Sequence, residues 1–156
     1  KLPVIAFYAI FQTIISEIDR YKQCRLAVMN SHTASDLTTR SAGDIEIYNS
    51  RNELIEAIEI KHNKPIYVSS VQIAREKIYK FNPRRYCIFS FQSISLNDKS
   101  KINRIIKDIK SDHGCQVIVN GIIPTLSYYL RLISSIPQFI EKYQEFPHSA
   151  QMRKKF

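Results

Sequence analysis

The chain has 156 residues, of which 44% are hydrophobic, and a formal net charge of +9. This length and hydrophobic content suffice for one core and predict a single domain over residues 1–156. Because no apolar run reaches about 18 residues, no membrane-spanning helix is expected. The positive charge favours a partner that carries phosphates, although many basic domains have no such partner.

The first third of the chain predicts a helix and then a hairpin. A helix is expected over about residues 4–27, and a polar loop follows as far as Ala42. Residues 43–48 and 54–61 are both rich in β-branched side chains, and the segment between them is polar. Two such runs around a polar turn predict a β-hairpin.

The rest of the chain alternates between helices and strands. After Pro65, a helix is expected over about residues 70–81, with Ser69 or Ser70 as its cap. The remaining predicted elements are a strand over residues 85–91, a helix from 97 or 98 to 114, a strand over 116–120 and a helix over 124–143. This order predicts an α/β sandwich around a mixed sheet.

The predicted hairpin brings two carboxylates together. With a two-residue loop at Arg51 and Asn52, Asp44 lies directly opposite Glu59, with Cβ atoms about 5 Å apart. A longer loop would slip the register by one residue and still leave the carboxylates as neighbours. Two carboxylates placed opposite each other repel, and a bound divalent cation removes that cost.

Side-chain alternation places Glu59 and Lys61 on one face of the second strand. Leu54, Ile58 and Ile60 point to the other face, so the strand is expected to be buried between layers. Two carboxylates with water and a phosphate oxygen suit Mg²⁺, and a nearby ammonium can orient or deprotonate the attacking water. The plainer interpretation of Glu-X-Lys is a weak ion pair on a solvated strand.

Two further glutamates serve as comparisons within the same strands. Glu46 and Glu56 each lie one step from the predicted site, and both are expected to be structural or peripheral.

Asp44, followed by Glu59-Ile60-Lys61 on the next strand and then by a helix and a strand, resembles the PD-(D/E)XK nuclease superfamily. The resemblance is closest to its type II restriction endonuclease-like members and covers about residues 40–95. A weaker similarity to those enzymes extends over residues 30–47. Gly43 stands where the family usually has a proline. The fold implied is a restriction endonuclease-like α/β/α sandwich, with a central mixed β-sheet flanked by helices.

The resemblance implies Mg²⁺-dependent hydrolysis of double-stranded DNA. Asp44 and Glu59 would be the metal ligands, and Lys61 would position the water or stabilise developing charge. Many members add an acidic residue from a helix before the sheet, for which Glu17 is the matching candidate and Asp19 the second. Gln72 lies where some members place a polar active-site residue. Both Glu17 and Gln72 could equally be ordinary helix-surface residues.

The polar loop before Asp44 is the segment expected to contact DNA near the cut, because long loops beside a rigid sheet often carry binding residues. Its candidate residues are His32, Thr33, Ser35, Thr38, Thr39 and Arg40. A second basic group lies on the helix that begins near residue 98 and could equally be a solvated face. Its members are Lys99, Lys101, Arg104, Lys107 and Lys110.

Several wider expectations follow. The three cysteines show no CxxC pairing, which favours burial in a reducing cytoplasm over a zinc site. The missing initiator Met suggests a fragment or a processed chain, so a fused DNA-recognition region or a cognate DNA methyltransferase is an expected partner. A homodimer is expected by analogy alone. Two alternatives stay open: a structure-specific nuclease, such as a junction resolvase, and a catalytically silent DNA-binding module.

Overall fold

The computed structural model of the chain describes residues 2–29 and 40–152. The elements in chain order are α1 (Leu2–Ile14), the 3₁₀ helix η1 (Asp19–Tyr21), β1 (Arg25–Leu26), β2 (Ile45–Tyr48), β3 (Leu54–Lys61), α2 (Val68–Phe81), β4 (Arg85–Ser90), α3 (Lys99–Asp112), β5 (Gln116–Gly121), α4 (Ile122–Leu132) and α5 (Ile136–Met152).

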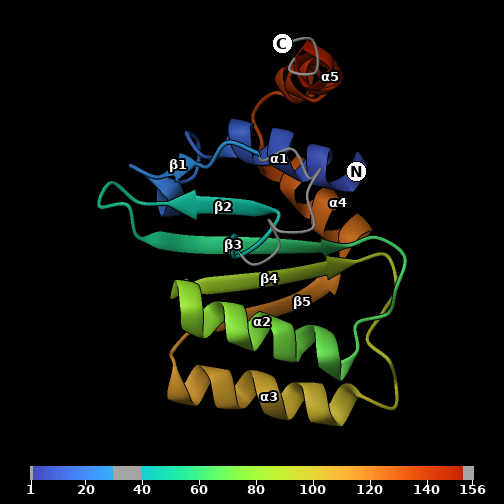
Figure 1. The fold of residues 1–156 in the computed structure, drawn as a ribbon. Helices are drawn as coiled ribbons and strands as arrows, with labels where there is room; N and C mark the ends of the chain where they lie inside the picture. The colour runs from blue at the N-terminus through green and yellow to red at the C-terminus, as the bar shows by residue number, and fades with distance from the viewer. Residues whose placement is uncertain (1, 30–39, 153–156) are drawn as a thin grey trace.

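The strands form one five-stranded sheet in the order β1-β2-β3-β4-β5. The pairs β1/β2 and β2/β3 are antiparallel, whereas β3/β4 and β4/β5 are parallel. Helices cover both faces: α2 and α3 lie on one side, and α1 and α4 lie on the other, with α5 beyond α1 (Figure 1). The α/β class and the mixed sheet predicted from the sequence are therefore confirmed.

Each face of the sheet has its own hydrophobic cluster. Ile45, Ile47 and Ile58 pack with α1 and α4, for example against Phe7 and Phe11. The other cluster joins the sheet to α2 and α3 and contains the following buried residues from all three: Ala57, Tyr86, Ile88, Val71, Ala74, Ile78, Ile102 and Ile109. The sheet is thus buried on both faces, as the apolar β3 sequence predicts.

The predicted helix over residues 4–27 is wrong in its second half. Helix α1 ends at Ile14, and η1 follows it. Arg25 then lies in the short edge strand β1 and pairs with Tyr48 of β2. Tyr21 is 1% exposed and packs in the same cluster as α1, with its ring against Phe11. Apolar residues therefore continue at helix-like spacing while the backbone turns, and the periodicity alone does not reveal the break.

The predicted last helix over residues 124–143 is two helices. Helix α4 ends at Leu132, and Ile133 adopts an extended backbone (φ −73°, ψ 142°) before α5 begins. Pro137 lies in the first turn of α5, where its missing N–H is tolerated, and a continuous helix through it would lose a hydrogen bond. Ser135 Oγ accepts from the Gln138 N–H (3.3 Å) and so helps to begin α5.

The predicted cap of α2 is also wrong. The N-cap position is Tyr67, with no side-chain cap, and neither Ser69 nor Ser70 occupies it. Instead, the Val68 N–H donates to Oδ2 of Asp98 at 3.2 Å. Asp98 lies between β4 and α3, so a long-range carboxylate satisfies the helix start that a local serine was expected to satisfy.

The hairpin has a longer loop than the simplest prediction, and its register matches the prediction within the strands but not at Asp44. The Asn49 N–H donates to the Glu53 carbonyl (3.0 Å), and Asn52 has a positive φ of 62°. The loop therefore has three residues, and an irregularity after Ile47 compensates for the extra one. Ile45 then pairs with Ile58, as predicted, but the Asp44 N–H donates to the carbonyl of that same residue, so Asp44 lies beside Ile58 and not directly opposite Glu59 as predicted. The same irregularity moves Leu54 into the cluster under α2 and α3, so its expected face is wrong.

Candidate active site

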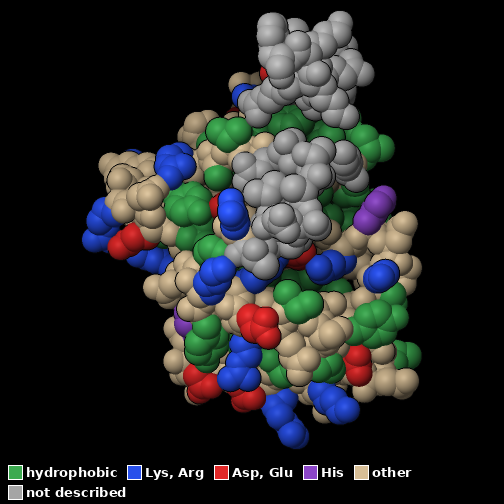
Figure 2. Space-filling view, in the orientation of Figure 1, with side chains coloured by type: hydrophobic (Ala, Val, Ile, Leu, Met, Phe, Trp, Pro, Cys, Tyr) green, Lys and Arg blue, Asp and Glu red, His purple; other side chains and the backbone are tan. Residues whose placement is uncertain are grey.

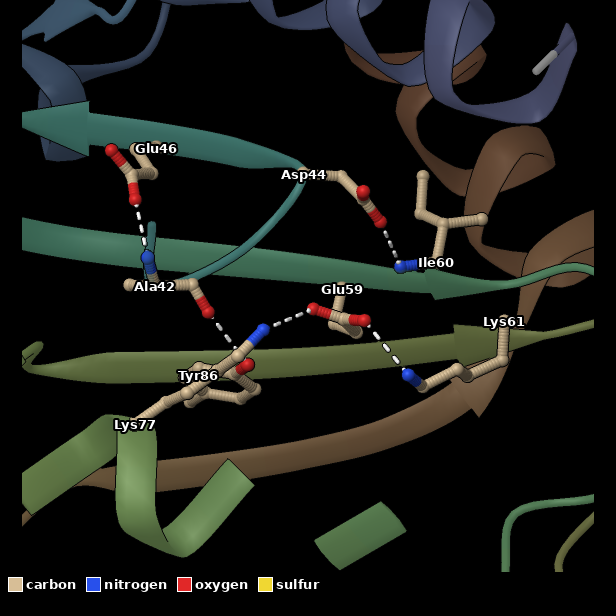
Figure 3. Close-up of polar contacts among 8 residues, drawn as sticks. All are labelled: Ala42, Asp44, Glu46, Glu59, Ile60, Lys61, Lys77 and Tyr86. Atoms are coloured by element: carbon tan, nitrogen blue, oxygen red, sulfur yellow. Dashed lines mark hydrogen bonds and ion pairs between the residues drawn. The ribbon is translucent and has the colours of Figure 1, made fainter. Parts of the chain in front are cut away.

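Asp44 lies directly before β2 and is fixed to β3 through both its backbone and its side chain. Its N–H donates to the Ile58 carbonyl at 2.8 Å, and its Oδ2 accepts from the Ile60 N–H at 2.8 Å (Figure 3). Gly43 makes this approach possible, because a Cβ at that position would lie 2.6 Å from the Ile58 carbonyl oxygen. A glycine at this position is therefore required by the close approach of the backbone to β3.

Glu59 is held between two ammonium groups. Oε1 accepts from Lys61 Nζ at 2.8 Å, and Oε2 accepts from Lys77 Nζ at 3.0 Å (Figure 3). The three side chains are partly buried, with exposed fractions of 18% for Glu59, 32% for Lys61 and 17% for Lys77. Burial alone would raise the pKa of Glu59, but Lys77 and Lys61 outweigh it and lower that pKa. Glu59 is therefore an anion at neutral pH.

Tyr86 of β4 has a buried hydroxyl whose pKa is affected by three carboxylates. Its hydroxyl donates to the Ala42 carbonyl at 2.7 Å and is buried. Burial first, and then the negative charges of Glu59, Asp44 and Glu46, raise the pKa of Tyr86. The carboxylates of Glu59, Asp44 and Glu46 thus all raise the pKa of this one buried hydroxyl.

The two comparison glutamates are engaged elsewhere, in agreement with their predicted structural roles. Glu46 accepts from the Ala42 N–H at 2.6 Å and from the Tyr48 hydroxyl at 2.9 Å. Glu56 is fully buried on the opposite face of β3, where the Arg85 guanidinium and the Tyr21 hydroxyl donate to it at 2.8 and 2.9 Å. Neither carboxylate binds Lys61 or Lys77 in these contacts.

Three further residues, Glu17, Asp19 and Gln72, are the additional candidates from the sequence. Both carboxylate oxygens of Glu17 accept from Ser134, from its hydroxyl at 2.6 Å and its N–H at 2.9 Å, which ties the end of α1 to the α4–α5 junction. Asp19 is exposed in η1, and Gln72 is exposed near the start of α2. Glu17 is therefore bound outside the candidate site of Asp44, Glu59 and Lys61, whereas the roles proposed for Asp19 and Gln72 stay predictions.

Most of the predicted DNA-contacting loop lies outside the described residues. This applies to His32, Thr33, Ser35, Thr38 and Thr39. Arg40 is described and exposed, two residues before the buried Ala42. The basic residues of α3 are all exposed. On the face seen in Figure 2, Lys and Arg side chains are spread widely, with acidic side chains among them.

Lys77 is the site residue that the sequence prediction missed. It is the residue of α2 that lies three positions after Ala74, and Val71, Ala74 and Ile78 form the buried stripe of that helix. A lysine at this spacing lies at the border of the stripe that faces the sheet. The spacing of the buried residues could have indicated that Lys77 lies near the sheet. It could not have shown that Glu59 is the partner of Lys77.

Asp44 and Glu59 are the carboxylates near the end of β3 that could hold a divalent cation, and both oxygens of Glu59 accept from lysines in the structure. Mg²⁺ is usually bound through one or two carboxylates, with waters and phosphate oxygens completing its six positions. Across residues 2–29 and 40–152, no group of three or more His, Cys, Asp or Glu side chains is arranged to hold a metal ion. An ion at this site would therefore rely on Asp44 and Glu59 alone among acidic side chains, which leaves most of its positions for water and substrate.

The remaining sequence expectations have these outcomes. Cys24, Cys87 and Cys115 are free thiols, and the last two are buried. Within the part of the chain that the structure describes, none of the helices has the length and apolar content needed to cross a membrane. No family model matches the chain, and no curated protein matches it in sequence.

Proposed function

We propose that this chain is a Mg²⁺-dependent DNA endonuclease whose active site is Asp44, Glu59 and Lys61. The observation that carries the proposal is the convergence at the end of β3: Asp44 contacts Ile60, between Glu59 and Lys61, and Lys61 binds Glu59 at 2.8 Å. A catalytically silent module would not require this combination of two carboxylates and a lysine.

The roles follow from the chemistry of each group. Asp44 and Glu59 would hold the cation, which lowers the pKa of bound water and stabilises charge on a phosphate oxygen. Glu59 must exchange at least one ammonium for the ion, because both of its oxygens accept from lysines. Lys61 is the more exposed of the two lysines and is therefore the one proposed to turn toward the attacking water.

The second lysine has a different role in this proposal. Lys77 comes from a helix and is more buried, so it would stay beside Glu59 and keep that carboxylate ionised and fixed in position. An ionised, oriented ligand needs less rearrangement when a cation binds.

The finer proposal is a type II restriction endonuclease acting on duplex DNA, with the chain or a longer form of it as a homodimer. Sequence specificity requires base-edge contacts, and the loop that ends near Arg40 is proposed to supply them. A cognate DNA methyltransferase would then protect the same sites.

Cleavage of unmethylated plasmid DNA with Mg²⁺ tests both the nuclease activity and its proposed sequence specificity. Wild-type protein should give discrete fragments, and Glu59→Ala and Lys61→Ala should give none. Glu53→Ala is the matched control, because Glu53 is a half-exposed carboxylate in the loop of the same hairpin. Cleavage that survives in Glu59→Ala would refute the assigned site. Salt-sensitive DNA binding without cleavage by wild-type protein would favour the silent module.

A further inference from the structure

The two loops that leave the parallel strands β3 and β4 are joined to each other. These loops, residues 62–67 and 91–98, are called the strand-end rim below. Ile66, which is 1% exposed, forms a β-bridge with Ile94, and its carbonyl accepts from the Ser95 N–H at 3.2 Å. Ser90 Oγ donates to the Lys64 carbonyl at 3.0 Å, and Gln92 Nε2 donates to the Asn63 carbonyl at 3.2 Å. The rim is therefore held in one conformation by contacts between its two loops.

This fixed rim presents aromatic and apolar side chains to solvent. Phe91 is 47% exposed, and its ring lies against exposed His62, with centroids 5.7 Å apart and planes at 49°. Tyr67 is 43% exposed and Leu96 is 88% exposed. The described residues that pack in the two hydrophobic clusters do not include these four. A rigid support that holds rings outside the core is typical of a binding surface.

The rim lies beside the candidate active site. Phe91 follows Ser90 and His62 follows Lys61, and Ser90 is the register partner of Lys61 in the β3/β4 pair. His62 and Phe91 are the first residues after the ends of β3 and β4. The rings therefore adjoin the site at the strand ends and would contact a neighbouring part of the substrate rather than the reacting phosphate.

The charge of the rim suits a phosphate backbone. Lys64 is exposed within it, and Lys61 precedes it. Its one carboxylate, Asp98, accepts from the Val68 N–H at the start of α2 and so faces a helix N-terminus. Exposed rings with basic neighbours are the features by which proteins bind single-stranded nucleic acid, since every base offers a π-face to an aromatic ring.

We propose that the strand-end rim stacks unpaired DNA bases, with Phe91 as the main stacking residue and His62 supporting its ring. This inference rests on the proposed nuclease activity and favours its structure-specific form over the type II restriction form, because it names the substrate class as DNA with unpaired nucleotides beside the scissile phosphate. Bases in a continuous duplex are already stacked on each other and cannot use the ring.

Fluorescence anisotropy in EDTA, where Mg²⁺-dependent cleavage is absent, tests the rim separately from catalysis. The probes are a short fluorescein-labelled single strand of mixed sequence and the blunt duplex of the same sequence. Phe91→Ala should weaken single-strand binding by about ten-fold, whereas Phe91→Tyr, which keeps the ring, should bind within about two-fold of wild type. Duplex binding should be unchanged in both variants.

Tyr79→Ala is the matched control. Tyr79 is an aromatic residue of α2 that is 49% exposed and packs against His113 rather than against the rim. Its variant should bind both probes as wild type does. Equal losses on both probes, an unchanged single-strand affinity in Phe91→Ala, or no single-strand binding by wild-type protein would each overturn the proposal. A wild-type protein that stacks single strands but never cleaves DNA would contradict only the nuclease function.

Discussion

Replacing Lys77 with methionine tests the electrostatic balance at Glu59, because the change keeps the side-chain stem and removes the charge. At an effective dielectric constant of about 20, an ammonium and a carboxylate at their separation of 3.0 Å attract by roughly 5 kcal/mol. Desolvation offsets much of this, since Lys77 is only 17% exposed and Glu59 only 18%. Lys61 also remains bonded to the other oxygen of Glu59. We therefore expect a net destabilisation of about 1–2 kcal/mol.

For a chain of this size, that loss corresponds to a fall in Tm of about 3–6 °C. The pKa of Glu59 should rise, because the largest of the causes that lower it is removed. A carboxylate with a lowered pKa contributes stability above its unfolded pKa and loses it as the pH falls through the folded pKa. The stability difference between wild type and Lys77→Met should therefore be full at neutral pH and shrink in acid.

The measurement is thermal unfolding from pH 7 down to about pH 3, followed by circular dichroism. Lys80→Met is the matched control, because Lys80 is an exposed lysine on the same helix. Equal melting temperatures for Lys77→Met and wild type at neutral pH would refute the ion pair. A difference that does not change with pH would refute its dependence on the charge of Glu59.

Three further predictions concern the scaffold. Glu56→Gln should destabilise the fold by about 3 kcal/mol or more in urea unfolding, because it leaves the guanidinium of Arg85 without its buried partner; a change as small as that of an exposed glutamate would contradict this. Gly43→Ala should cost about 1–3 kcal/mol in the same assay, since its Cβ would meet the carbonyl of Ile58 at 2.6 Å; wild-type stability would show that the strands separate easily. Native protein should react with a thiol reagent mainly at Cys24, because the other two thiols are buried and burial raises both of their pKa values, and rapid labelling of all three would contradict that burial.

Much of the site was predictable from the sequence because it depends on local rules. Two β-branched runs around a polar turn predict a hairpin, and the period of two along β3 places Glu59 and Lys61 on one face. The predicted register occurs within the strands, where Ile45 pairs with Ile58, although the loop has three residues and the Asp44 N–H bonds Ile58 rather than lying opposite Glu59. An irregularity after Ile47 absorbs the extra residue, and no turn signal in the sequence predicts such an irregularity.

The missed features depend on contacts between distant parts of the chain. Lys77 reaches Glu59 from another element, and Asp98 supplies the cap of α2 from beyond β4. The end of α1 and the break before α5 were missed for a related reason, because Tyr21 and Ile133 bury apolar side chains outside an α-helix. Hydrophobic periodicity reports burial, and burial continues where the helix has stopped.

The most direct test of the central claim is whether Asp44 and Glu59 bind the same cation. Mn²⁺ in place of Mg²⁺ can be followed by electron paramagnetic resonance during titration of wild type, Asp44→Asn, Glu59→Gln and the double variant. Glu46→Gln is the control, since Glu46 lies near the same tyrosine but accepts from Ala42 and Tyr48. One shared ion predicts that each single variant weakens binding and that the double variant loses less than the sum of the two free-energy changes. Independent, additive losses, or an affinity that neither substitution changes, would contradict a shared metal site.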